Sequence, residues 1–109
     1  MTEEIVFLYV TTPDAECAGR IADRLVGEGI AACVNIFPGV TSVYRWRGAV
    51  ERSNECVAIV KCARASLDRA RETIAASHPY ETPSITCIAI DGPASSPDFL
   101  QWILENSAC

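Results

Sequence analysis

The sequence lacks the long apolar run that a membrane-spanning helix requires. No window of its 109 residues approaches the roughly 18 uninterrupted apolar residues that cross a bilayer as a helix. It also lacks a basic start, because Met1 to Glu4 is acidic, whereas a secretory signal begins with positive charge. We therefore expect a cytoplasmic protein with no membrane partner.

Basic residues are scarce and scattered. Nine Lys and Arg stand against 14 Asp and Glu, which gives a net charge of −5. No cluster of basic and aromatic residues forms the platform that nucleic-acid binding uses. The charge pattern therefore excludes nucleic acid as an expected partner.

The motifs of nucleophilic, phosphate-binding and zinc chemistry are missing. The sequence has no G-x-S-x-G, no P-loop, no G-x-G-x-x-G and no C-x-x-C. Of the six cysteines, we expect four to act as small hydrophobic residues within apolar runs, namely Cys33, Cys56, Cys62 and Cys87. Cys17 and Cys109 are expected to be more exposed. No enzymatic activity is indicated.

Apolar residues, in contrast, are abundant for so short a chain. Half of the residues are hydrophobic, and the mean hydropathy is +0.17. A domain of this size is mostly surface, so the surplus apolar area needs a cover. We expect one domain over residues 1–109 that buries part of its surface against another subunit.

The pattern of apolar runs and turn residues predicts six elements in the order βαββαβ, followed by a short C-terminal helix. The strands are expected at residues 5–10, 32–46, 50–62 and 85–90, and the helices at 12–28, 66–77 and from Ser96 onward. Thr12 is the expected N-cap of the first helix. Residues 5–10 and 56–62 are continuous apolar runs, typical of central strands buried on both faces. This order is that of an α+β, ferredoxin-like sandwich.

The hairpin between residues 32 and 55 is longer than a sheet of this size needs. Its first strand spans about thirteen residues, against a usual 5–6, and Pro38-Gly39 interrupts it. Tyr44 and Trp46 lie near its tip, where large apolar rings are costly to leave in water. We expect the overhang to pair with another subunit, the alternative being a hairpin that folds back over its own sheet.

The densest polar stretch is His78-Pro79-Tyr80-Glu81-Thr82-Pro83. The His78 imidazole and the Glu81 carboxylate would supply half of a site for Cu²⁺ or another divalent cation, with the other ligands coming from elsewhere. The alternative is a rigid connector in which His78 satisfies the last carbonyls of the preceding helix. Lys61, a rare charge within an apolar strand, either snorkels at the strand end or faces a pocket and meets an anion or Glu55.

Four segments of the chain, taken together, resemble the CutA family of divalent-cation tolerance proteins. They are residues 12–14, residues 31–36 with Pro38-Gly39, residues 42–48 with Glu51 and Glu55, and residues 78–83. The resemblance implies a ferredoxin-like homotrimer whose hairpin strands pair across subunits, through Val40, Val43, Tyr44 and Trp46. It also implies similarity to the trimeric PII-type regulators, which bind small ligands in clefts between subunits.

The resemblance implies a role in the response to metal ions, with copper binding and no established enzymatic activity. Two of the family's copper-ligand positions are Val10 and Ser77 here, so only His78 matches, and metal binding through His78 and Glu81 is expected to be weak. The alternative is a PII-like signalling module with a ligand cleft near four residues, Trp46, Lys61, Tyr80 and Glu55. No protein partner besides the chain itself is indicated.

Overall fold

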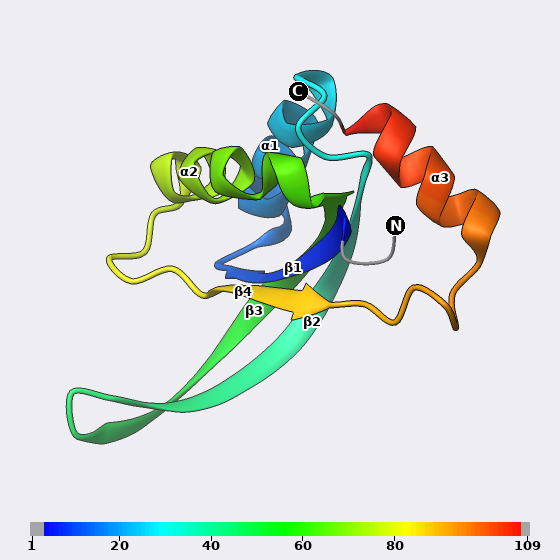
Figure 1. The fold of residues 1–109 in the computed structure, drawn as a ribbon. Coiled ribbons are helices and arrows are strands. Elements are labelled where there is room, and N and C mark those ends of the chain that lie inside the picture. The colour runs from blue at the N-terminus through cyan, green and yellow to red at the C-terminus, as the bar shows by residue number, and fades with distance from the viewer. Residues whose placement is uncertain (1–3, 108–109) are drawn as a thin grey trace.

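A computed structural model describes residues 4–107, which form one four-stranded sheet and three α-helices (Figure 1). In chain order the elements are β1 (Ile5–Thr12), α1 (Ala15–Gly27), β2 (Cys33–Trp46), β3 (Ala49–Ala63), a single 3-10 turn η2 (Arg64–Ser66), α2 (Leu67–Ser77), β4 (Ile85–Ala89) and α3 (Pro97–Asn106). The sheet order is β2-β3-β1-β4, with every neighbouring pair antiparallel. The predicted α+β, ferredoxin-like βαββαβ fold is confirmed, and β1 and β3 are its central strands.

The main core lies between the sheet and the helices α1 and α2, which share one of its faces (Figure 1). Alternate residues of β1 point into it, and Val6, Leu8 and Val10 are fully buried. They pack with Leu25 of α1 and Ile74 of α2, which are equally buried. Within residues 4–107, no helix is long and apolar enough to span a membrane.

The opposite face of the sheet is only partly covered. Helix α3 covers one end of it, where Ile103 packs against Ile5. Beyond α3, Tyr9, Phe37 and Ile88 lie on this face, with 37%, 45% and 42% of their surfaces exposed. The prediction that the first strand is buried on both faces is therefore wrong for the single chain, because no element of the described chain covers this part of the sheet.

The β2–β3 hairpin projects away from the helices, so the alternative of a folded-back hairpin is wrong (Figure 1). The predicted interruption at Pro38-Gly39 is a β-bulge within one continuous strand, since the register shifts between Phe37 and Val40. At the tip, Arg47 and Gly48 have φ of 52° and 83°. Two successive left-handed residues form the two-residue turn whose twist matches that of a hairpin.

The start of α1 differs in detail from the sequence-based expectation. Its N-cap is Asp14, whose Oδ1 accepts a 2.8 Å hydrogen bond from the Cys17 amide, and Thr12 instead hydrogen-bonds to the Cys56 carbonyl. Cys17 is consequently buried, contrary to expectation, because it faces the core from the first turn. Cys87 is exposed on the edge strand β4. Cys109 and residues 1–3 lie outside the described residues.

Candidate functional site: a cavity between the hairpin and the α2–β4 connector

A cavity of about 410 Å³ lies between the hairpin and residues 78–84, which connect α2 to β4 and are called the connector below. The residues that line it are Thr11, Ser42, Tyr44, Trp46, Glu55, Tyr80, Glu81, Thr82 and Ser84. Because side chains alternate along a strand, Ser42, Tyr44 and Trp46 share one side of β2. The cavity thus combines the end of β1, one side of the hairpin and the connector. Its volume is in the range of small-molecule sites.

Sequence reasoning singled out five of these nine residues, including Tyr44 as a subunit contact and Glu81 as a metal ligand, and missed the polar remainder. Trp46, Glu55 and Tyr80, predicted as cleft residues, do come together. Thr11, Ser42, Thr82 and Ser84 were missed, although the alternation Ser42-x-Tyr44-x-Trp46 carries the signal for Ser42. Val43, predicted with Tyr44 and Trp46 as a subunit contact, lies on the other side of the hairpin, opposite Arg52.

The Tyr80 ring joins the connector to the hairpin. Its hydroxyl donates a hydrogen bond to Oε2 of Glu55 on β3. Burial raises the pKa of the Tyr80 phenol above its ordinary value of 10.0, and the adjacent Glu55 carboxylate raises it further. Tyr80 is therefore a neutral hydrogen-bond donor to Glu55 throughout the physiological range.

Tyr80 should make unfolding easier at alkaline pH. The unfolded chain ionises this phenol near its ordinary pKa of 10.0, whereas the folded protein keeps it protonated at higher pH. The stabilising contribution is thus complete below pH 10 and is lost as the pH rises above it. We expect the unfolding free energy of the wild type to fall more steeply above pH 10 than that of Tyr80→Phe. Urea titrations at several pH values measure this, and equal slopes would contradict it.

His78 is buried, and both of its ring nitrogens are already hydrogen-bonded. Its Nε2 donates to the Thr11 carbonyl at 2.7 Å, and its Nδ1 accepts from the Tyr80 amide at 3.2 Å. These two bonds specify the neutral ring with the proton on Nε2, so no lone pair remains for a metal. The ring also does not cap the helix, because only the His78 backbone N–H reaches a helix carbonyl, that of Ala75.

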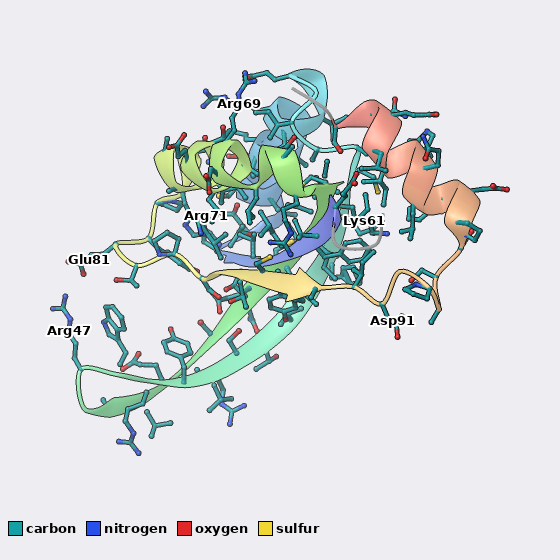
Figure 2. All side chains as sticks on the ribbon, in the orientation of Figure 1. Arg47, Lys61, Arg69, Arg71, Glu81 and Asp91 are labelled. Carbon is teal, nitrogen blue, oxygen red and sulfur yellow. The ribbon has the colours of Figure 1, made fainter. Side chains whose placement is uncertain are left out.

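Glu81 points away from His78 toward the hairpin tip. Its Oε1 lies 3.2 Å from the Arg47 guanidinium, and both side chains are 73% exposed. Figure 2 shows the two labelled side chains facing one another between the connector and the hairpin tip. Residues 4–107 contain no group of three or more His, Cys, Asp or Glu that could hold a metal ion. Within one chain the predicted donor pair of His78 and Glu81 is thus engaged in other contacts, and metal binding through it stays a prediction.

Lys61 does not line the cavity of the single chain, and its predicted place in a cleft between subunits stays a prediction. Its Nζ is 5.3 Å from the ring centre of Phe7 and 5.2 Å from that of Phe99. Six residues along β3 separate it from Glu55, roughly 20 Å at the rise of a strand. Figure 2 places Lys61 at the α3 end of the sheet, away from Arg47 and Glu81. Within one chain Lys61 therefore helps to hold α3 against the sheet, through its contact with the Phe99 ring.

Fold and cavity together define a ferredoxin-like α+β domain with its candidate site between a projecting hairpin and a helix-to-strand connector. The chain belongs to the family described as CutA1 divalent ion tolerance protein, whose model matches residues 6–106. The divalent-cation tolerance protein CutA of Thermus thermophilus is 40% identical over 105 residues, covering 96% of this chain and 98% of that protein.

Two further relatives widen this comparison. A chloroplastic CutA of Arabidopsis thaliana is 38% identical over 94% of this chain, which spans about half (54%) of that longer protein. A solved structure described as the PII-like protein CutA from Nostoc in apo form has a TM-score of 0.88 and 32% identity. That match covers 94% of this chain and 97% of the Nostoc chain.

Proposed function

We propose that this protein is a cytoplasmic homotrimer that binds a small ligand in the cavity and acts in the response to metal ions by binding, without turnover. The main support for this proposal is that the cavity is open to a ligand, whereas the neighbouring His78 ring is fully hydrogen-bonded. The cavity has a volume of about 410 Å³ and brings together Tyr44, Trp46, Glu55 and Tyr80, whereas both ring nitrogens of His78 are hydrogen-bonded. Ligand binding, as in a PII-like module, is therefore favoured over direct metal binding.

Direct Cu²⁺ binding through His78 and Glu81 stays a prediction, and the hydrogen bonds of the ring oppose it. A copper ion would have to displace either the Thr11 carbonyl or the Tyr80 amide. Imidazole offers a metal only the lone pair of an unprotonated nitrogen. The relatives' names record divalent-cation tolerance. A regulator can contribute to such tolerance without binding the metal itself, if the concentration of its ligand changes with that of the metal.

The trimer is supported by the sheet face that α1 and α2 leave open. The continuous apolar run of β1 is typical of a strand buried on both faces, yet Tyr9 is exposed in the single chain. The strand β2 is also an edge along all of its 14 residues, with unpaired backbone groups ready for another chain. Val40 and Val43 remain the predicted hairpin contacts between subunits.

The ligand site is tested by filling the cavity. We expect Ser42→Trp to occupy it, because Ser42 is half-buried on the cavity side of β2. A panel of nucleotides, amino acids, amines and polyols is screened by thermal shift, since a ligand of the folded state raises the melting temperature. A true ligand should stabilise the wild type and the control Gln101→Trp, on exposed α3, but not Ser42→Trp. Equal stabilisation of all three would place the site elsewhere.

A further inference from the structure

We propose that the cavity binds an organic ammonium ion, a protonated amine attached to an apolar body of about the size of a benzene ring. This inference rests on the proposed function, since it names the chemical class of ligand for the same cavity. Three features support this inference. They are the charge of the residues that line the cavity, the aromatic rings among them, and the unused hydrogen-bond acceptor positions of Glu55.

The charge of the lining is of one sign. Among the described residues that line the cavity, the charged ones are Glu55 and Glu81, and none is Lys, Arg or His. Glu81 is paired with Arg47, whereas Glu55 has no ion pair in the part of the chain that the structure describes. A phosphate or carboxylate ligand would therefore meet an uncompensated negative charge, and a cation would neutralise it.

Three aromatic side chains, Tyr44, Trp46 and Tyr80, line the same space. The negative face of an aromatic ring attracts a cation within about 6 Å of its centre, and several rings around one point form the cage that recognises ammonium groups. The protein already places a cation on one of them, since the guanidinium carbon of Arg47 lies 5.4 Å from the Trp46 ring centre. This contact marks the Trp46 face as one that accepts positive charge.

The Glu55 carboxylate can accept further hydrogen bonds. Its Oε2 accepts one hydrogen bond from the Tyr80 hydroxyl, whereas a carboxylate offers about four acceptor positions. Glu55 is half-buried, so a charge-assisted bond to an ammonium group would be screened less than one at the open surface. The hydroxyls of Ser42, Thr82 and Ser84 would bond the polar end of the ligand, and the rings would cover its apolar body.

The experiment compares a matched pair of ligands by calorimetry at pH 7. Phenethylamine is protonated at this pH, and phenethyl alcohol is its neutral counterpart of the same shape. We expect the amine to bind the wild type at least tenfold more tightly than the alcohol, and ATP to give no heat of binding. Glu55→Gln should reduce the amine affinity at least tenfold and abolish the preference for the amine over the alcohol.

Matched variants separate the local effect of Glu55 from the net charge and from folding. Glu72→Gln removes one negative charge from the exposed side of α2 and should bind the amine like the wild type. Trp46→Leu changes a side chain that is 44% exposed, so it should fold normally while it weakens amine binding several-fold. Both variants remain informative if Glu55→Gln is poorly folded.

Equal affinities of the amine and the alcohol would overturn the ammonium assignment, and so would unchanged amine binding by Glu55→Gln or the absence of any amine binding. If the alcohol or another compound binds the wild type but not Ser42→Trp, the cavity is a ligand site for a different class and the proposed function stands. If no compound distinguishes Ser42→Trp from the wild type, the proposed function fails together with the ammonium inference.

Discussion

Replacing His78 with alanine should lower the unfolding free energy by about 2–3 kcal/mol, from two lost hydrogen bonds of roughly 1 kcal/mol each and a small internal void. The side chain is only 9% exposed, and its ring ties the connector to the end of β1 through Thr11. The variant leaves the Thr11 carbonyl without this partner. Urea unfolding of the wild type and His78→Ala measures the difference.

The same variant should leave the Cu²⁺ binding isotherm unchanged, because neither ring nitrogen has a free lone pair in the wild type. Ser77→His is the matched positive control. It places a second imidazole next to His78 at the half-buried end of α2, where its nitrogens start without these two partners. We expect this variant to bind Cu²⁺ more tightly than the wild type. Loss of Cu²⁺ binding in His78→Ala would identify His78 as a copper ligand. It would contradict the expectation that the ring only ties the connector to the end of β1.

The fold was predictable because local signals agree with one another along the whole chain. Pro79 ends α2 at Ser77, as expected from its effect on the preceding residue. The Arg47-Gly48 turn and the two apolar central strands are likewise where the pattern predicts them. Each of these features depends on residues that are neighbours in sequence, so no long-range knowledge is needed.

The residues of the candidate site were predictable only where the alternation of side chains along a strand shows which of them share one face. Alternation along β2 places Tyr44 and Trp46 together on the cavity side, and it places Val43, a predicted subunit contact, on the other side. The partners of Lys61 and His78 come from α3 and from the end of β1, far away in sequence. The polar character of a residue shows that it needs a partner, but not which segment supplies it.

Replacing Ile88 with glutamate should convert the proposed trimer into monomers. Ile88 lies opposite Phe7 on the open face of the sheet and is 42% exposed in the single chain. A carboxylate there is solvated in the monomer, so we expect a change in monomer stability of only about 0.5 kcal/mol. In an assembly that covers this face, the same carboxylate would be buried without a partner, which costs several kcal/mol per subunit.

Light scattering gives the result directly as a mass. The wild type and the control Val26→Glu should each show three times the chain mass of 11.8 kDa, and Ile88→Glu should show the single chain mass. Val26 is a fair control because it is 44% exposed and of similar chemistry, but it lies on α1, across the sheet from the open face. A wild type that is already monomeric would contradict the trimer, and an unchanged mass for Ile88→Glu would exclude this face as the interface. Dissociation with a retained, cooperative unfolding transition would mean that the sheet face holds the subunits together while each chain folds on its own.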